Sequence, residues 1–471
     1  MTRFEPHDYQ RDALSWLIGR TLLSGSGGGA LFLDPGLGKT AVSLAWIRAG
    51  MALHKIRKVL IIAPLRVVYS VWPAEAHKWD QFRDLRISIV HGTRTQRMAA
   101  LSAPADLFLI NPEGTEFLRD YYANRPVPFD ALIIDESSKF KSWGAKRTKA
   151  LRKLLPQFLH RIILTGTPSP NSLEDLFPQV FCVDLGESLG TGVSKFRSRY
   201  FYRGGFGGYK WIPHETSQQA IELKIKHLCL RLNAEDYLDL PELLINDIPV
   251  SLPDDAREKY DQLEKEMFLA IDEDLGQDGF MTPDNAGARY QACKQLAGGG
   301  VYDAEDKSKT HEFHTAKVEA VDDIIGELQG KPAIIAYQYK HDLKRLRKRW
   351  PKMPSIDGST SGKQTDALVR KWNAGKLPLL AVQPQALSHG VNMQSGPGRD
   401  LIWYGLTDNL ETYLQLNARL YRQGVTGQVR IHRLLTERTV DEAVADRINR
   451  KDATQTALLD ALDRYRKGKA E

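Results

Sequence analysis

The residues with the clearest chemical potential lie at positions 34–40, which read Asp-Pro-Gly-Leu-Gly-Lys-Thr between an apolar run and an apolar helical pattern. A glycine-rich turn between a strand and a helix lets backbone N–H groups approach a polyphosphate and donate hydrogen bonds to it. In such a turn Lys39 reaches the β- and γ-oxygens and the Thr40 hydroxyl ligates Mg²⁺. The usual pattern has glycine where Leu33 stands, five residues before Gly38. For this segment alone, a plain glycine-rich turn therefore remains an alternative.

Two adjacent carboxylates, Asp135 and Glu136, end another apolar run. In a phosphate-loop ATPase the first carboxylate holds Mg²⁺ and the second polarises the attacking water. A carboxylate pair at the end of a strand also has a structural role in many proteins. The catalytic interpretation is favoured here because the pair follows Lys39 in the same α/β half of the chain. Segment 164–168, Leu-Thr-Gly-Thr-Pro, follows a further apolar run. Its hydroxyls suit either a relay that senses the γ-phosphate or an ordinary turn.

Three polar side chains near the other end of the chain, Gln415, Arg419 and Arg422, have the spacing i, i+4, i+7. The spacing predicts that they share one face of a helix. Arginines on such a face complete a triphosphate site that is held by another part of the chain, and an arginine of this kind contributes about 10³–10⁵ in turnover. A solvated basic face is the alternative.

The elements that must position these residues follow the same pattern twice. Short apolar runs alternate with helical patterns over residues 30–165 and again from about residue 315. Continuous apolar strands separated by helices indicate a buried parallel sheet, so we expect an α/β fold with two such lobes. The expected strands lie at residues 30–33, 59–63, 87–90, 107–110, 131–134, 161–164, 333–336, 355–357, 379–382, 401–404 and 429–433.

Bulk properties narrow the class of protein. A chain of 471 residues is too long for one core. It has no apolar run of membrane-spanning length and no signal-peptide pattern, which predicts a soluble, cytoplasmic protein without a membrane partner. The net charge of +7 favours a polyanionic partner. The three cysteines have neither metal-ligand spacing nor a disulfide framework.

In their order over residues 6–440, these motifs resemble a superfamily-two nucleic-acid motor of the Swi/Snf type. The resemblance implies two RecA-like lobes with parallel sheets, helical protrusions between the core motifs, and the cofactors ATP and Mg²⁺. It divides the chain into a first lobe at 1–245 with a protrusion at about 184–240, a helical protrusion or linker at 246–312, and a second lobe at 313–471. The interlobe segments are similar to the compact branch that includes annealing helicases, viral or bacterial in size.

The resemblance also implies a set of site residues. Gln10, in the segment Pro-His-Asp-Tyr-Gln, would read adenine. Lys39, Asp135, Glu136, Gln415, Arg419 and Arg422 would be catalytic, with Thr40 and Asp135 at the metal. The nucleotide would be bound by Gln10, Pro35, Gly36, Leu37, Gly38, Lys39, Thr40, Ala41 and Gly390. Ser137-Ser138 stand where the family usually has Ala-His, a change that leaves the metal role intact.

Nucleic acid would lie across both lobes and be bound through its backbone without sequence preference. The implied contacts are Arg66, His91, Gly92, Asn111, Gln338, Tyr339, Ser388 and Asn392. Two basic stretches are further candidates for DNA contact. For residues 195–211 the alternative is aromatic packing in a protrusion, and for residues 340–350 it is a solvated helix face.

The sequence therefore predicts an ATP-dependent translocase on duplex or branched DNA. A strand-separating DNA or RNA helicase is the first alternative. A nucleotide-gated DNA clamp without turnover is the second. A simple phosphate-loop kinase does not need a second α/β lobe.

Overall fold

The computed structural model describes residues 2–23, 27–166, 172–204, 210–232, 234–237, 240–276, 283–303, 306, 308–387 and 391–450. The chain divides into two compact units. The first comprises Met1–Gly204 with Lys210–Asp239, and the second comprises Gly205–Tyr209 with Leu240–Glu471. None of the helices in the described ranges has both the length and the apolar content needed to cross a membrane.

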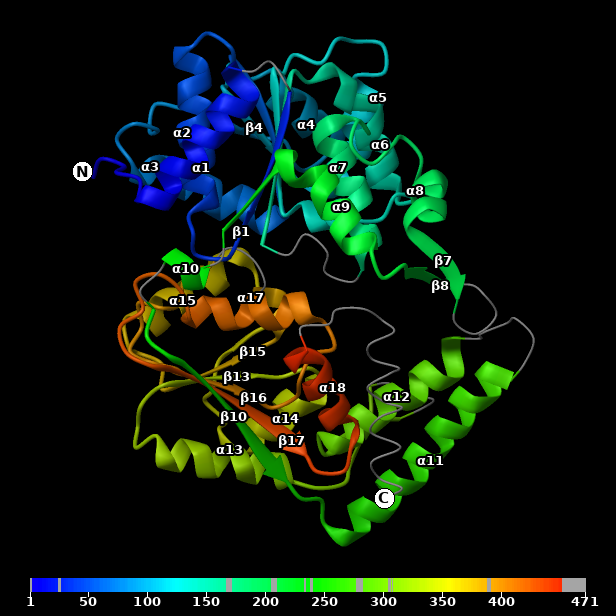
Figure 1. Cartoon of the computed structure of the whole chain (residues 1–471). Helices are drawn as coiled ribbons and strands as arrows, with labels where there is room; N and C mark the ends of the chain where they lie inside the picture. The colour runs from blue at the N-terminus through cyan, green and yellow to red at the C-terminus, as the bar shows by residue number, and fades with distance from the viewer. Residues whose placement is uncertain are drawn as a thin grey trace. The chain divides into compact units, whose positions relative to one another are not determined.

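A seven-stranded, wholly parallel sheet forms the centre of the first unit, in the order β3-β4-β2-β5-β6-β1-β9 (Figure 1). Because the strands are parallel, all of their carboxyl ends lie at one edge of the sheet, where ligands bind in open α/β sheets. The strands are β1 (Gly28–Leu33), β2 (Val59–Ile62), β3 (Ile87–Ile89), β4 (Leu107–Ile110), β5 (Ala131–Asp135), β6 (His160–Thr165) and β9 (Cys229–Leu232).

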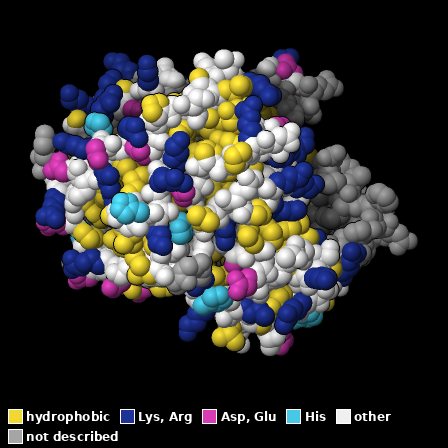
Figure 2. Space-filling view, turned by 90° about the horizontal axis from the view of Figure 1, so that it is seen from above, with side chains coloured by type: hydrophobic (Ala, Val, Ile, Leu, Met, Phe, Trp, Pro, Cys, Tyr) yellow, Lys and Arg dark blue, Asp and Glu magenta, His cyan; other side chains and the backbone are white. Residues whose placement is uncertain are grey.

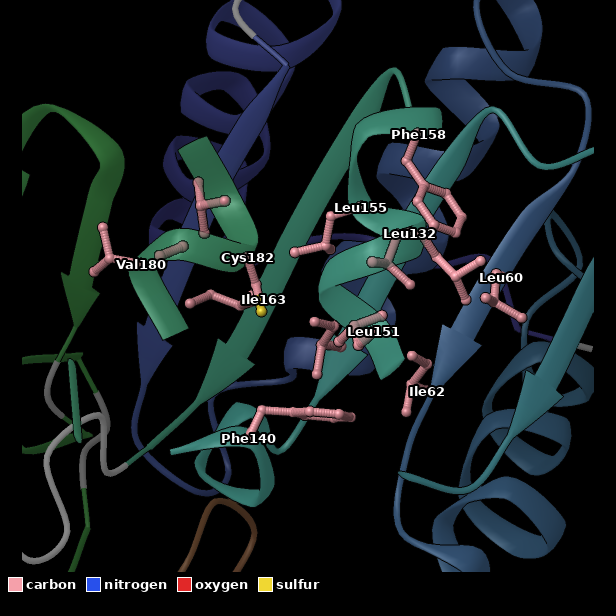
Figure 3. Packing of buried hydrophobic residues seen from close by; sticks show 14 of the residues in the cluster. Leu60, Ile62, Leu132, Phe140, Leu151, Leu155, Phe158, Ile163, Val180 and Cys182 are labelled. Carbon is pink, nitrogen blue, oxygen red and sulfur yellow. The ribbon is translucent and has the colours of Figure 1, made fainter. Parts of the chain in front are cut away.

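Helices cover both faces of this sheet. One face packs in a cluster with α1 (Asp8–Ile18), α2 (Lys39–Ala52) and α3 (Trp72–Lys78). The other face packs with α4 (Arg94–Leu101), α5 (Thr115–Tyr121), α6 (Lys146–Leu154), α7 (Leu176–Asp184), α8 (Val193–Tyr200) and α9 (Ser217–Ile225). Figure 3 shows this second cluster, in which residues of β2, β5 and β6 meet those of α6 and α7. Burial on both faces explains why β1, β2 and β4 consist only of apolar residues and glycine.

Shorter elements complete the first unit. A two-stranded antiparallel hairpin, β7 and β8, follows α8, and a π-helical turn, η2, precedes α3. Their bounds are β7 (Phe201–Gly204), β8 (Lys210–Pro213), α10 (Ala234–Tyr237), the π-helical turns η1 (Gly19–Leu23) and η2 (Val67–Val71), and the 3₁₀ turns η3 (Pro112–Gly114), η4 (Ser137–Phe140), η5 (Leu155–Gln157), η6 (Leu173–Asp175) and η8 (Lys226–Leu228).

The second unit contains a six-stranded parallel sheet in the order β10-β17-β16-β13-β15-β14. Apolar clusters again lie on both faces, one with α13 and α14 and the other with α11, α12, α15, α17 and α18. The strands are β10 (Leu243–Val250), β13 (Ala333–Ala336), β14 (Ser355–Ile356), β15 (Leu379–Val382), β16 (Asp400–Trp403) and β17 (Val429–Thr436), with a separate hairpin of β11 (Gly300–Tyr302) and β12 (Thr310–Glu312). The helices are α11 (Asp254–Gly276), α12 (Pro283–Ala297), α13 (Ala316–Glu327), α14 (Lys340–Arg349), α15 (Gly362–Asn373), α16 (Pro384–Leu387), α17 (Leu410–Leu420) and α18 (Val440–Asn449).

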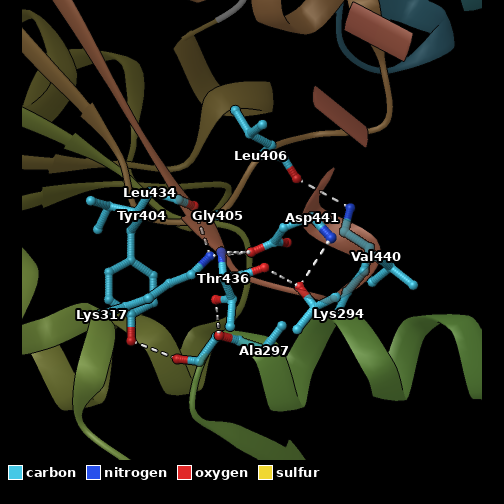
Figure 4. Close-up of polar contacts among 12 residues, drawn as sticks. Lys294, Ala297, Lys317, Tyr404, Gly405, Leu406, Leu434, Thr436, Val440 and Asp441 are labelled. Carbon is cyan, nitrogen blue, oxygen red and sulfur yellow. Dashed lines mark hydrogen bonds and ion pairs between the residues drawn. The ribbon is translucent and has the colours of Figure 1, made fainter. Parts of the chain in front are cut away.

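Buried polar contacts join the helices of the second unit to its sheet (Figure 4). Lys317 on α13 pairs with Asp441 on α18 at 2.5 Å, and their side chains are only 1% and 4% exposed. The same ammonium donates to the carbonyl of Leu434 in β17 at 3.0 Å. Charged groups this deeply buried are tolerated because each one is paired and hydrogen-bonded.

The predicted α/β class with two sets of parallel strands is confirmed. The structure adds one strand to each parallel sheet that the sequence did not predict, β9 and β10, together with the two antiparallel hairpins β7-β8 and β11-β12. β10 pairs along its whole length with β17. Residues 243–250 therefore belong to the second sheet, which extends further toward the N-terminus than the predicted lobe boundary at 313.

Candidate active site

The predicted phosphate loop is a tight turn between β1 and α2. Gly36 and Gly38 have φ of 98° and 78°, in the left-handed region that favours glycine. The helix begins at Lys39, so the N–H groups of Thr40 and Ala41 lie in its first turn, where such groups lack partners within the helix. The side chains of Leu37 and Ala41 are buried, and Pro35 is half-buried.

Gln10 on α1 lies directly against this loop. Its Nε2 donates to the carbonyl of Leu37 at 3.1 Å, and its Oε1 accepts from the N–H of His7 at 3.0 Å. A Cβ atom built on Gly38 would lie 2.4 Å from Gln10 Nε2, so only glycine fits there. Lys39 Nζ donates to the carbonyl of Leu33 at 2.6 Å, which places the ammonium over the start of the loop.

The acidic pair and the threonine of segment 164–168 meet the loop at the same sheet edge. β6 lies between β5 and β1, and Asp135 is in register with Leu164 while Phe32 is in register with Thr165. A Cβ atom on Gly166 would lie 3.2 Å from Pro35 Cδ, so this turn touches the phosphate loop. The predicted hydroxyl of Thr167 lies outside the described residues.

Asp135 and Glu136 have very different surroundings. Burial, together with the neighbouring Glu136, raises the pKa of Asp135 to about 6, while the indole N–H of Trp72 and the charge of Lys39 act in the opposite direction. Glu136 has φ of 64°, a left-handed conformation that is uncommon outside glycine and recurs at functional sites. Its Oε1 accepts from Thr165 Oγ1 at 3.2 Å and from the adjacent Ser138 hydroxyl at 3.1 Å.

These residues fit a Mg²⁺ ion. A carboxylate and a hydroxyl, from Asp135 and Thr40, are hard oxygen ligands, and Mg²⁺ characteristically takes one or two protein ligands together with water and phosphate oxygens. The desolvated Asp135 carboxylate favours a cation beside it. The described ranges hold no group of three or more His, Cys, Asp or Glu side chains arranged for a metal. A cage made entirely of such side chains is therefore not found there.

In the second unit, Gln415 and Arg419 lie on α17 as predicted, but the expected three-residue helix face is wrong for Arg422. The helix ends at Leu420, because Tyr421 leaves the helical region with φ of −92° and ψ of 90°. Arg422 therefore lies in the turn beyond the helix. Gln415 is buried, and its Nε2 donates to Glu411 Oε1 at 3.0 Å.

The two arginines are bound to segment 391–393. Arg419 Nη1 donates to the carbonyl of Val391 at 3.0 Å, and the Arg419 carbonyl accepts from the N–H of Met393 at 3.1 Å. The Arg422 guanidinium donates to Asn392 Oδ1. Asn392, a predicted nucleic-acid contact, thus shares a hydrogen bond with a predicted catalytic arginine. Ser388 and Gly390 lie outside the described residues.

The predicted nucleic-acid residues of the first unit follow three neighbouring strands. Arg66 comes after β2, His91 and Gly92 after β3, and Asn111 after β4. They therefore share the carboxyl edge of the sheet with the phosphate loop, on the half formed by β3-β4-β2. Asn111 is buried and donates to Glu113 Oε2 at 2.8 Å, whereas Gly92 is exposed. Lys and Arg side chains recur over the face shown in Figure 2 among acidic and apolar ones.

Gln338 and Tyr339 follow β13 in the second unit. Gln338 Nε2 donates to the carbonyl of Gly405 at 3.2 Å. The Tyr339 hydroxyl donates to Gln291 Oε1 at 2.8 Å, and burial raises the pKa of this phenol. Both side chains are thus engaged within their own unit.

Sequence reasoning missed one residue that touches the site. The indole N–H of Trp72 donates to Asp135 Oδ2 at 2.9 Å across 63 positions of sequence. No local sequence pattern connects Trp72 with the carboxylate.

A parallel sheet that carries a phosphate loop after one strand and an acidic pair at the same edge, on the next strand but one, is typical of a phosphate-loop nucleotide hydrolase. Residues 9–281, more than half of the chain, match the SNF2-related domain, and residues 316–424 match the helicase conserved C-terminal domain. The chain belongs to the SNF2-related family. It is an ATP-hydrolysing enzyme with the helicase/translocase core of that family.

Individual proteins are similar to this chain over most of its length. The chain is 36% identical to protein p41 of Acyrthosiphon pisum secondary endosymbiont phage 1, over 98% of this chain and 100% of the phage protein. It is 25% identical to the uncharacterized ATP-dependent helicase MG018 of Mycoplasma genitalium, over 94% of this chain but 41% of that protein. The Sulfolobus solfataricus SWI2/SNF2 ATPase core in complex with dsDNA is 21% identical, with a TM-score of 0.45 over 95% of this chain and 93% of that one.

Proposed function

We propose that the protein is an ATP-dependent translocase that moves along double-stranded DNA and remodels DNA structures or bound proteins. The observation that carries this proposal is the meeting of the phosphate loop, Asp135, Glu136 and Thr165 at one edge of the first sheet. The adjoining half of that edge, after β3, β4 and β2, supplies strand ends that suit sequence-independent phosphate contacts.

Each residue has a role that its chemistry supports. Lys39 binds the β- and γ-phosphates, and Asp135 with Thr40 holds Mg²⁺, which would stabilise charge on the transferring phosphoryl group. Glu136 is the general base, and its hydrogen bond from Thr165 fixes the orientation of the carboxylate toward the attacking water.

Arg419 and Arg422 complete the site from the second unit, and Gln415 supports the γ-phosphate end. Hydrolysis that requires arginines from the other unit would depend on closure of the two, and closure is how a motor couples turnover to movement. The links from these arginines to segment 391–393 support such coupling, because that segment carries the proposed DNA contact Asn392.

The remaining DNA contacts proposed are Arg66, His91, Gly92, Asn111, Gln338, Tyr339 and Ser388. Phosphate contacts of this kind predict binding that weakens steeply with salt, by about 0.9 in the logarithmic slope for each neutralised phosphate of a duplex. DNA sequence should have little influence.

The test combines ATPase and triplex-displacement assays with duplex DNA. Lys39→Ala and Glu136→Gln should abolish DNA-stimulated ATPase and displacement, whereas the exposed controls Lys149→Ala and Glu187→Gln should keep both. Wild-type turnover by either site variant refutes the assignment. Stronger stimulation by RNA or single strands favours a strand-separating helicase, and negligible turnover with saturating DNA favours a clamp.

A further inference from the structure

Trp72 is a fully buried residue whose single polar group is directed at the catalytic carboxylates. Its indole N–H donates to Asp135 Oδ2 at 2.9 Å, and its side chain is 0% exposed. The contact is possible because β2 and β5 are neighbours in register, with Ile62 beside Ile134. The chain that leaves β2 therefore passes over the end of β5, where Asp135 stands.

The backbone before Trp72 has an unusual form. Residues 67–71 make a π-helical turn, η2, and Trp72 follows as the first residue of α3. Turns of this kind are rare and are frequently found at functional sites.

A carboxylate has two oxygens, and a fixed donor on one of them fixes the direction of the other. We propose that Trp72 is a positioning residue that orients Asp135 to bind Mg²⁺ in the nucleotide complex. This inference rests on the proposed function, in which Asp135 is the metal ligand. Residues that hydrogen-bond to metal ligands typically contribute 10–100-fold to metal affinity or activity.

The rival explanation is that Trp72 only needs a partner for its buried N–H group, as most buried tryptophans do. The first unit offers a matched control for this explanation. Trp46 belongs to the same apolar cluster and is also 0% exposed, and its indole N–H donates to Thr21 Oγ1 at 2.8 Å, on a residue with no role in the site. Trp46→Phe and Trp72→Phe thus remove equivalent hydrogen bonds, of which only one reaches a metal ligand.

The experiment measures ADP affinity by calorimetry, with saturating Mg²⁺ and with EDTA. The ratio of the two affinities isolates the contribution of the metal, which a purely structural tryptophan does not change. Trp72→Phe should reduce this ratio about tenfold while the affinity in EDTA stays at the wild-type value. Trp46→Phe should leave the ratio unchanged. In ATPase assays the Mg²⁺ concentration for half-maximal rate should rise about tenfold for Trp72→Phe alone.

The outcomes separate the two proposals. An unchanged ratio in Trp72→Phe, or an equal fall in Trp46→Phe, overturns the role of Trp72 and leaves the proposed function standing. Failure of the wild-type protein to bind ADP refutes the proposed function itself. Should Trp72→Phe not fold, Trp72→His, which keeps a ring N–H donor, replaces it. If the affinity ratio of Trp72→His lies closer to the wild-type value than the ratio of Trp72→Leu does, the result supports the role of Trp72. Equal ratios for Trp72→His and Trp72→Leu refute it.

Discussion

The buried pair of Lys317 and Asp441 offers a quantitative test of what stabilises the second unit. Replacing Lys317 by Met keeps most of the apolar stem and removes the ammonium, so the loss is mainly electrostatic. The Asp441 carboxylate, 4% exposed, would retain the N–H of Thr436 at 3.2 Å but lose its counter-charge. Removing one partner of a buried pair typically costs about 3–5 kcal/mol.

If the free energy of unfolding falls by about 3 kcal/mol per molar urea, this cost lowers the unfolding midpoint of the second unit by roughly 1–1.7 M. The double variant Lys317→Met/Asp441→Leu should recover most of the loss, because apolar residues of similar volume often replace a buried ion pair without penalty. Hydrogen exchange read by mass spectrometry on β16 and β17 peptides in urea follows this unit separately from the first.

The matched control is Lys348→Met on α14. Lys348 Nζ lies 2.6 Å from Glu312 Oε2, almost the same separation, but its side chain is 61% exposed. Solvent screening limits such a pair to less than about 1 kcal/mol. Equal shifts of the midpoint for Lys317→Met and Lys348→Met would refute the reasoning, and so would a double variant no more stable than Lys317→Met.

Two further predictions concern a close backbone contact and a buried histidine. A Cβ atom on Gly28 would lie 2.2 Å from the carbonyl oxygen of Val183. Gly28→Ala should therefore destabilise the first unit by about 1–3 kcal/mol in thermal unfolding, whereas Gly19→Ala, with open space around it, should not; equal melting curves would contradict this. Burial lowers the pKa of His314 to about 4, although its Nε2 contacts the carbonyl of Leu296 at 2.8 Å. Between pH 6.5 and 4 the unfolded chain binds the extra proton, so stability should fall by about 2 kcal/mol from pH 7 to 5. His314→Gln should flatten that slope in urea titrations, and an unchanged slope would rule out His314 as its source.

The strands that the sequence predicted and those that it missed differ in how they are covered. β1, β2, β4 and β5 are buried on both faces, so their residues are apolar without interruption and the pattern is visible in the sequence. β10 carries Asn246 and Asp247 at its centre. Asp247 is satisfied by the Arg433 guanidinium of β17, a partner 186 residues away, and no local pattern indicates that contact.

The site shows the same division between local and distant information. The order of the phosphate loop and the acidic pair could be predicted because each is a short motif at the end of a strand. The end of α17 at Leu420 could not, because the i, i+4, i+7 spacing is compatible with a longer helix and the partner of Arg422, Asn392, is distant in the sequence. The contact of Trp72 with Asp135 could not be predicted either, since the two residues lie 63 positions apart, one on α3 and the other at the end of β5.

β9 and β10, the strands of the parallel sheets that the sequence missed, flank the segment in which the chain passes from the first unit to the second. β9 ends the described sheet of the first unit at Leu232, and β10 begins the pairing of the second at Leu243. The Leu232 carbonyl accepts from the N–H of Asp34 at 3.1 Å, and Asp34 is the first residue of the phosphate loop. The end of β9 is therefore hydrogen-bonded directly to that loop. Because β9 is an edge strand that pairs with β1 alone among the described strands, this hydrogen bond gives its end a second contact, with the phosphate-binding turn, that no local sequence pattern indicates.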